Sequence, residues 1–541
     1  MRVSGKASVL GALLLVSAAC ADLDVVNLND ADADRALTTP GDIESLIAGS
    51  YRQWWLGAVT AGGFGPALSN IAWQHSGWPA NFGVVFYSSM PRPATINDPT
   101  DQYYGNLSSM WNQAYRGLSA IASGLQALDR DPDLGAALGA PAVARLRAYA
   151  KFVQGLSHAA VAVHYSHGFL IDEGTAVFDE SGQVVPQNIV GYQEVLAAAL
   201  GYFDEAINLS QGQTWPDIPT GWMSVNVSPA QLAQLAHSMK ATHRAAAART
   251  PADRVAVDWA AVIQDVDQGI TANWEMNVPR GGDPWTVAFY NQFFGPAWQQ
   301  ISYQVAGMAD QSGTYQKWID TPTDARLPDI DGQPFLIITP DLRFPQGATI
   351  EEQRAAPGTL YDIPASLGNH FQQPGRGTYR WSYYWAKTMR DWGAGNGMAA
   401  VVPIQQMDLL KAEALYRLAG NQMTAEAAAL VNKTRMAAGL DDISDGVNDS
   451  CVPRLYSGAC GDFFEALKWE ARFETIFSPG LYLAPWYFHG RGWGDLFANT
   501  PLHLPLPCLE MQLRQDVCTN YGGIGGESAA QMSVYAWPHE G

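Results

Sequence analysis

The sequence has few charged residues, and basic residues are the scarcer kind. Charged residues make up 16% of the 541-residue chain, and 32 Lys and Arg stand against 52 Asp and Glu, which gives a formal net charge of −20. Proteins that bind nucleic acid normally present a basic surface, so we do not expect nucleic acid as a partner. A hydrophobic fraction of 47% excludes a disordered chain, because it is enough to form a folded core.

Apolar runs of 18 or more residues are also lacking. Arg2 and Lys6 precede a small apolar run over 7–19, which is too short to span a bilayer and ends directly before Cys20. Small residues before a cysteine are typical of lipoprotein processing. We therefore predict that 1–19 is a lipoprotein signal peptide and that Cys20 becomes the lipidated first residue. An ordinary secretory signal is the alternative.

Cysteine is scarce, with five residues in the whole chain. Apart from Cys20, the cysteines are Cys451, Cys460, Cys508 and Cys518. An even number in an exported protein predicts two disulfides. The local pairs Cys451–Cys460 and Cys508–Cys518 are the simplest choice, although four cysteines allow three connectivities. The tighter Cys-x-x-Cys or Cys/His spacing of a zinc site is missing, so we expect no metal at these residues.

Both flanks of the chain show helical periodicity. Paired helices of this size resemble tetratricopeptide-type units, although the strict repeat signature is not visible. The capping pattern of Asp462 and Glu465 predicts the start of one helix, and Thr424 and Gly439 bound another. The remaining predicted helices are 41–57, 101–129, 143–165, 191–209, 229–248, 256–272 and 404–419, and the helix after Asp462 is predicted to cover 463–477.

Three long stretches lack this periodicity. Residues 58–100, 276–400 and 478–541 are rich in Gly, Pro, Asp and aromatic residues. This composition predicts long loops with short strands. Loops of such length are usually functional or disordered, and the aromatic content argues against disorder.

Several segments together resemble the SusD/RagB family of outer-membrane nutrient-binding lipoproteins. The most specific are 406–416 and 431–440, which are similar to the family pattern LLRAEA…NxxRxxAGL. Residues 468–474 resemble its late ERRxE helix, and 504–510 resemble its closing lPiPxxE motif. The start of the mature chain, with 38–51, resembles the family's opening.

The resemblance implies a mainly α, SusD-like fold, in which tetratricopeptide-type helix pairs support a loop-rich lobe with short strands. It divides the mature chain into an N-terminal helical part over 20–275, which contains the aromatic loop 58–100, a loop-rich lobe over 276–403, and a C-terminal part over 404–541. It also implies a lipid-anchored binding protein of the outer membrane, at the cell surface, rather than an enzyme. The implied partner is a SusC-like TonB-dependent transporter, to which the protein delivers a nutrient.

Aromatic residues gather in two of the loops, over 71–87 and 285–303. A flat ring can cover the C–H face of a sugar while amide side chains bond its hydroxyl groups. Core packing of these rings is the alternative. A third cluster, over 379–385, alternates along a predicted strand and is expected to be core. The predicted oligosaccharide site contains Trp73, Trp78, Asn81, Phe82, Tyr87, Trp285, Tyr290, Gln292 and Trp298.

Other functions remain open at this point. A RagB-like peptide receptor needs a groove with backbone donors and acceptors more than it needs flat rings. An exported helical-repeat scaffold for proteins and an exported hydrolase are further alternatives, but no catalytic constellation is found. Glu470 and Glu474 share a helix face and are expected to belong to a structural ion-pair network.

We expect no cofactor. Calcium is a weak alternative, because Asp30, Asp32 and Asp34 begin like a calcium loop while Arg35 replaces the glycine that such a loop requires. Residues 441–449 match the same pattern less well.

Overall fold

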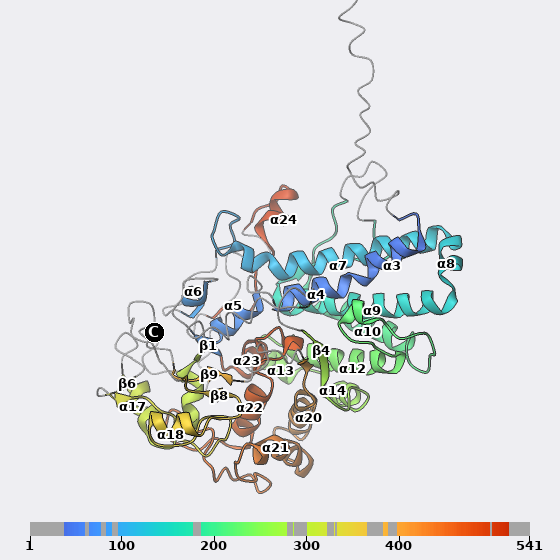
Figure 1. Cartoon of the computed structure of the whole chain (residues 1–541). Coiled ribbons are helices and arrows are strands. Elements are labelled where there is room, and N and C mark those ends of the chain that lie inside the picture. The colour runs from blue at the N-terminus through green and yellow to red at the C-terminus, as the bar shows by residue number, and fades with distance from the viewer. Residues whose placement is uncertain are drawn as a thin grey trace, which may run out of the picture.

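The structure is a computed structural model. It is mainly helical, and its strands are two to five residues long. Figure 1 shows a stacked array of helices on one side and, on the other, a lobe that contains several of the short strands together with α17 (Thr314–Asp320) and α18 (Ile350–Ala355). The predicted mainly α fold class with a strand-poor lobe is therefore confirmed. The structure describes residues 37–59, 64–76, 83–88, 96–176, 185–278, 285, 300–321, 329–330, 333–364, 382–387, 398–497 and 500–518.

The N-terminal layer is built on a long central helix, α7 (Tyr104–Arg130). The helices α3 (Pro40–Ala48) and α4 (Ser50–Val59) pack along it, and α9 (Ala140–His164) packs against another side. The side chain of Thr39 accepts a hydrogen bond from the N–H of Asp42 and so caps α3. One turn residue, Gly49, separates α3 from α4, so the single helix predicted over 41–57 is two helices.

The array continues through three further helices. The helix α10 (Tyr192–Asn208) packs against both α9 and α12 (Pro229–Ala246), and α12 packs against α14 (Trp259–Asp267). Ser228 and Gln231 form a capping box at the start of α12, which satisfies two backbone donors that the helix leaves unpaired. Short helices connect these elements: α8 (Pro132–Leu138), α11 (Thr220–Met223) and α13 (Pro251–Val255).

The C-terminal helices extend the array. The helix α20 (Ile404–Leu418) packs against α14, α21 (Ala425–Ala437) and α22 (Phe463–Glu474). Asp462 caps α22 as predicted, because its side chain accepts a hydrogen bond of 2.9 Å from the N–H of Glu465, and the side chain of Glu465 pairs with Lys468. The helix ends at Glu474, three residues before the predicted end. The chain then continues through η8 (Pro479–Leu481), α23 (Pro485–Trp493) and α24 (Cys508–Leu513).

The lobe and its junction with the helices contain small antiparallel strand pairs. The pair of β4 (Trp274–Asn277) with β10 (Met398–Val402) is the longest of those described. The pair of β1 (His75–Ser76) with β5 (Gln300–Ile301) lies near that of β8 (Tyr361–Asp362) with β9 (Trp385–Ala386), since β5 contacts β9. The other short elements are α5 (Phe64–Ile71), α6 (Val84–Ser88), β2 (His167–Gly168), β3 (Val190–Gly191), α16 (Tyr303–Ala306), η2 (Gly307–Ala309), β6 (Asp329–Ile330) and β7 (Gln333–Pro334).

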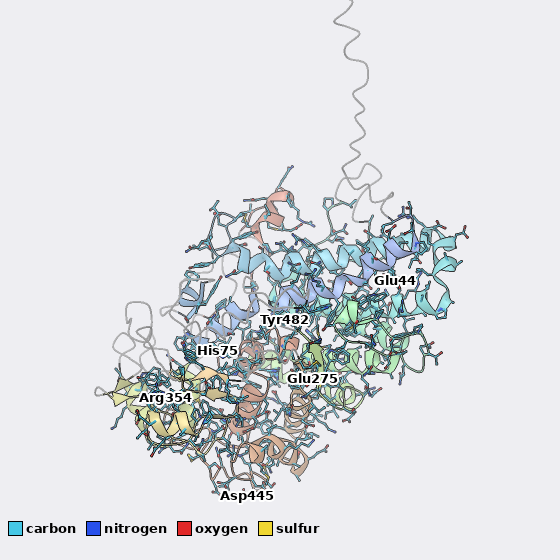
Figure 2. All side chains as sticks on the ribbon, viewed as in Figure 1. Glu44, His75, Glu275, Arg354, Asp445 and Tyr482 are labelled. Carbon is cyan, nitrogen blue, oxygen red and sulfur yellow. A yellow bond between two sulfur atoms is a disulfide. The ribbon has the colours of Figure 1, made fainter. Side chains whose placement is uncertain are left out.

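One hydrophobic core runs through the helical array and the lobe. It includes Ile43 of α3, Trp318 of α17 and Trp469 of α22, which belong to the three predicted parts of the chain. Figure 2 shows His75, Glu275 and Tyr482 toward the middle of the molecule, whereas Asp445 lies at its edge. Burial of large apolar side chains at this junction is what joins the lobe to the helices.

Two disulfides close short loops near the C-terminal end of the described chain. They join Cys451 to Cys460 and Cys508 to Cys518, so both are the local pairs. In the parts of the chain that the structure describes, no helix combines the length and the apolar character needed to cross a bilayer.

Candidate functional site

Trp73, one of the predicted ligand-binding rings, is fully buried. It lies between α5 and β1, and its ring centroid is 3.9 Å from that of Phe497. Its indole Nε1 donates a hydrogen bond of 3.2 Å to the carbonyl of Ser88. A ring covered in this way has no free face for a sugar. The prediction is therefore corrected for this residue, which belongs to the core.

The same correction applies to Tyr87 and Trp285, which are also buried. Tyr87 packs against Tyr103 at 5.7 Å between ring centroids. Trp285 packs against Tyr51 and Trp55, at 6.0 Å and 6.5 Å. Aromatic side chains contribute large apolar areas to a core, and here that contribution decides their placement.

The described residues of the third aromatic cluster lie in the core. Tyr383, Tyr384 and Trp385 are all buried. The prediction that this cluster belongs to the core is therefore confirmed for these three residues. Ile301 of β5 donates a backbone hydrogen bond of 3.3 Å to the carbonyl of Tyr384, which ties this strand to the β1–β5 pair.

The remaining six predicted site residues lie outside the described residues. The chain next to two of them is described, however, because Ser76 is the direct strand partner of Gln300. The segment with Trp78 follows Ser76, and the segment with Trp298 precedes Gln300. These two aromatic segments therefore leave the described fold at one residue pair. The six residues are Trp78, Asn81, Phe82, Tyr290, Gln292 and Trp298.

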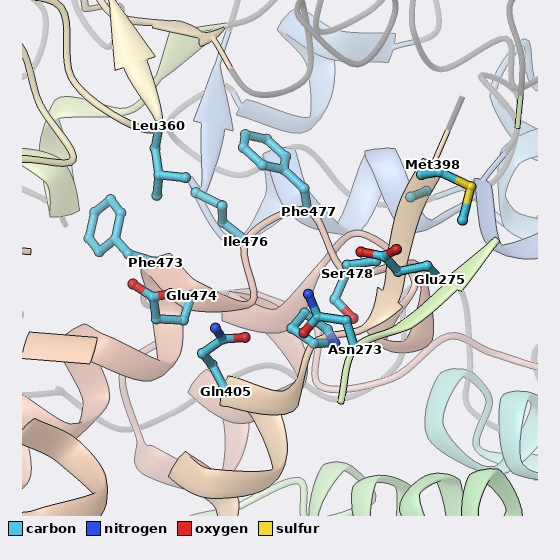
Figure 3. A pocket seen from close by; sticks show the side chains of 13 residues that line it. Asn273, Glu275, Leu360, Met398, Gln405, Phe473, Glu474, Ile476, Phe477 and Ser478 are labelled. Atoms are coloured by element: carbon cyan, nitrogen blue, oxygen red, sulfur yellow. The ribbon is translucent and has the colours of Figure 1, made fainter. Parts of the chain in front are cut away.

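The described part of the chain contains a pocket of about 310 Å³ where the β4–β10 pair and the adjoining ends of α20 and α22 meet the lobe. Figure 3 shows Glu474 and Glu275 on opposite sides of this pocket, with Gln405 and Asn273 between them and Phe477 above. We call it the Glu474 pocket. It is lined by Asn273, Glu275, Leu360, Met398, Ala399, Ala400, Pro403, Gln405, Phe473, Glu474, Ile476, Phe477 and Ser478.

Three elements position the polar side chains of the Glu474 pocket. Glu275 lies on β4 between the buried residues Trp274 and Met276, so the strand pleat turns it outward. Asn273 accepts a hydrogen bond of 2.9 Å from the N–H of Ile404 and so fixes the start of α20. Gln405 lies in the first turn of that helix.

Glu474 connects the pocket to a buried ion cluster. The guanidinium of Arg343 donates hydrogen bonds of 2.8–3.1 Å to Asp341, Glu470 and Glu474. Burial raises the pKa of Glu474 to about 7; Arg343 acts against this shift, while the nearby charges of Glu470 and Asp341 add to it. Glu474 is thus a carboxyl group that changes its charge near neutral pH and faces an open pocket.

The expected ion-pair network of Glu470 and Glu474 is confirmed, and their common partner is Arg343. Sequence reasoning did not predict the pocket that this cluster borders. Asn273, Glu275 and Arg343 come from segments with no motif, and only the fold brings them near Glu474. The helical spacing of Glu470 and Glu474 was the signal that a charged partner had to face them.

Metal ligation finds no support in the described part of the chain, where no group of three or more His, Cys, Asp and Glu is placed to hold an ion. In the loop 441–449, Asp442 accepts hydrogen bonds from Asn432 and from the N–H of Ser444. Asp445 accepts one from the N–H of Val447. Asp30, Asp32 and Asp34 lie outside the described residues.

Solved structures show which fold this is. A SusD superfamily protein from Bacteroides thetaiotaomicron VPI-5482 matches with a TM-score of 0.53 and 14% identity, over 88% of this chain and 97% of that chain. A SusD homolog from Parabacteroides distasonis ATCC 8503 matches with a TM-score of 0.57 and 12% identity, over 91% and 98%. A SusD superfamily protein from Bacteroides vulgatus ATCC 8482 matches with a TM-score of 0.50 and 13% identity, over 93% and 96%.

The chain therefore has the SusD fold along most of its length, as the sequence resemblance predicted. No protein-family model matches the sequence, and no curated protein matches it. The identities of 12–14% explain this difference, because a fold can persist after sequence similarity has been lost.

Proposed function

We propose that this protein is a lipid-anchored receptor of the outer membrane that binds an oligosaccharide and delivers it to a SusC-like TonB-dependent transporter. The SusD fold over most of the chain is the observation that carries the proposal. The predicted signal peptide over 1–19 and lipidation at Cys20 support a position at the membrane. Two lipid chains on such a cysteine would make this attachment stable.

The ligand site is proposed at the aromatic segments that begin after Ser76 and end before Gln300. The described residues next to these segments, Ser76 and Gln300, are strand partners. Trp78 and Trp298, each two residues from that pair, would cover the C–H faces of sugar rings. Asn81 and Gln292 would bond the hydroxyl groups, and Phe82 and Tyr290 would complete the apolar surface.

Binding without chemistry is sufficient for this function. A receptor beside its transporter raises the concentration of ligand at the entrance, and no bond has to break. The protein then needs only to stack on the sugar, to bond its hydroxyl groups and to stay tethered beside the transporter.

Ligand binding by the mature chain without Cys20 tests the proposal. Tryptophan fluorescence and calorimetry are recorded against matched panels of oligosaccharides and peptides. Saturable binding of an oligosaccharide, lost in the Trp78→Ala/Trp298→Ala variant at unchanged melting temperature, is expected. Binding of peptides alone would replace the glycan receptor by a RagB-like peptide receptor. Hydrolysis of any glycan in the panel would contradict a receptor without catalysis.

Membrane attachment is tested separately in cells. The Cys20→Ser variant should move from the outer-membrane fraction to the soluble exported fraction, because it lacks the thiol that carries the lipid. A Cys451→Ser/Cys460→Ser variant is the matched control, since it also replaces cysteine by serine but keeps the predicted anchor. Retention of the Cys20→Ser variant in the membrane would contradict lipid anchoring at this residue.

A further inference from the structure

The Glu474 pocket has acidic and amide side chains but no basic side chain in its lining. Glu275 and Glu474 are its carboxylates, and Asn273 and Gln405 are its amides. Glu275 and Gln405 make no side-chain hydrogen bond to another described residue, so their polar groups are available to a ligand. An acidic pocket of this kind favours a ligand that is positively charged and has hydroxyl groups.

The opposite wall of the pocket is a fixed apolar surface. The ring of Phe477 stacks on the ring of His75 at 5.6 Å with an interplanar angle of 24°, and it also meets Tyr361 at 6.4 Å. Phe477 nevertheless stays partly exposed. In Figure 3 its ring, Ile476 and Leu360 lie across the pocket from the polar side chains. Because the ring is already immobilised, little side-chain entropy is lost when a ligand packs on it.

In the ion cluster behind the pocket, three carboxyl groups share the guanidinium of Arg343. Arg343 uses its Nε, Nη1 and Nη2 groups on Asp341, Glu470 and Glu474, so one guanidinium faces three carboxyl groups. Glu474 receives a single hydrogen bond from Arg343, of 3.1 Å to Oε1, and it is the member that borders the pocket. A cation in the pocket would place a positive charge next to Glu474, the carboxyl group that Arg343 contacts least.

We propose that the Glu474 pocket is a second ligand site, which binds an amino-sugar unit with its protonated amine beside Glu474. The ring hydroxyl groups would bond Gln405 and Asn273, and a C–H face of the sugar would pack on Phe477. The pocket volume of about 310 Å³ is at the small end of ligand sites and suits one such unit. This site is built from different residues than the proposed site at Trp78 and Trp298.

The charge of Glu474 gives this binding a pH signature. The charged groups that face Glu474 are Arg343, Asp341 and Glu470 from the cluster and Glu275 from across the pocket. An ammonium ion favours the ionised carboxylate, so binding below pH 7 must expel the proton of Glu474. We therefore expect the affinity to fall up to about tenfold per pH unit below the pKa of about 7, over a range in which the amine stays protonated. A neutral sugar should show no such fall.

Calorimetry with glucosamine and glucose, which differ in one amine, tests the proposal. At pH 7 glucosamine is expected to bind roughly tenfold more tightly than glucose, a difference typical of one charge-assisted hydrogen bond. Glu474→Gln should remove this preference, whereas Glu351→Gln, on the exposed first turn of α18, should keep it. Equal affinities for the two sugars, or an unchanged preference in Glu474→Gln, would overturn the proposal.

Two further arms distinguish this pocket from a general amine site and from the aromatic site. Nα-acetyllysine carries an amine without a sugar ring, so binding as tight as that of glucosamine would overturn the assignment to a sugar. The Trp78→Ala/Trp298→Ala variant should keep the glucosamine preference, because its residues are not part of the pocket. Loss of the glucosamine preference in this variant would contradict the proposal that the Glu474 pocket is a separate site. Gln405→Ala, which leaves the Arg343 cluster intact, should weaken glucosamine and glucose alike.

Discussion

Arg343 and Glu474 are joined by a hydrogen bond of 3.1 Å, and through it the buried ion cluster reaches a solvent-accessible pocket. Asp341 and Glu470 occupy the same guanidinium more fully than Glu474 does. Arg343 therefore donates two side-chain hydrogen bonds each to Asp341 and Glu470, whereas Glu474 receives one and responds to pH and to what lies in the pocket.

The first prediction concerns stability as a function of pH. The folded pKa of Glu474, about 7, lies above its ordinary value of 4.5, so the folded state holds a proton that the unfolded state releases between these values. Stability should fall as the pH rises through this window. Glu474→Gln replaces the carboxyl group by an amide that does not ionise. The change in the free energy of unfolding caused by this substitution should therefore be about 1–3 kcal/mol more favourable at pH 8 than at pH 4. Urea unfolding at both pH values measures it, and an effect independent of pH would contradict the assignment.

The second prediction concerns the buried pair of Arg254 and Glu413. Two guanidinium nitrogens of Arg254 donate to the two carboxylate oxygens, and the indole of Trp493 donates to both at 3.1 Å. Burial alone would raise the pKa of Glu413, but Arg254 lowers it to about 2. Arg254→Ala should destabilise the protein by about 3–5 kcal/mol, because it removes the bidentate partner of a buried carboxylate and leaves it only the longer contacts of 3.3 Å with Arg417 and 3.1 Å with Trp493.

The matched control for this pair is Lys433, which forms an exposed ion pair of 3.0 Å with Asp408. Lys433→Ala should cost less than about 1 kcal/mol, as exposed pairs do. Denaturant unfolding of both variants at pH 7 makes the comparison. Similar losses of unfolding free energy in both variants would contradict a larger contribution of the buried pair.

The third prediction concerns the disulfide between Cys451 and Cys460. This bond closes a short loop, since the two residues are nine positions apart. Its removal in Cys451→Ser/Cys460→Ser should lower the free energy of unfolding by about 2–3 kcal/mol, mainly because the unfolded chain gains freedom. Thermal unfolding with and without reductant provides the measurement. Reductant also breaks the disulfide between Cys508 and Cys518. A Cys508→Ser/Cys518→Ser variant measured in parallel therefore separates the contributions of the two disulfides.

The fourth prediction separates core tryptophans from ligand-binding ones. Trp73→Ala should destabilise the protein by about 3–5 kcal/mol, because its ring fills the core against Phe497. Trp78→Ala should leave the melting temperature unchanged and weaken oligosaccharide binding. Thermal unfolding and calorimetry are measured on both variants. A loss of stability in both, or a loss of binding alone in both, would contradict the distinction between a core tryptophan and a ligand-binding one.

The sequence predicted the helices well and the site less well. Helices such as α7 and α20 have long apolar periodicity and recognisable ends, and both were predicted within three residues at each end. The rings could not be sorted in the same way, because burial of Trp73 depends on Phe497, more than 400 positions away. Composition alone does not distinguish a tryptophan of a core from one that stacks on a sugar.

The Glu474 pocket shows a second limit of the same kind. Glu470 and Glu474 indicated an ion-pair network by their helical spacing, but their partner Arg343 lies in a loop of the lobe. Glu275 and Asn273 reach the pocket through the pairing of β4 with β10, which joins segments over 100 residues apart. Long-range pairing of this kind leaves no local signal in the sequence.

Oligosaccharide binding by the mature protein, measured by calorimetry against matched glycan and peptide panels, tests the proposed receptor function most directly. We expect saturable binding of at least one oligosaccharide, no binding of peptides, and loss of that binding in Trp78→Ala/Trp298→Ala without a change in melting temperature. Binding of peptides alone, or oligosaccharide binding that survives this double substitution, would contradict it.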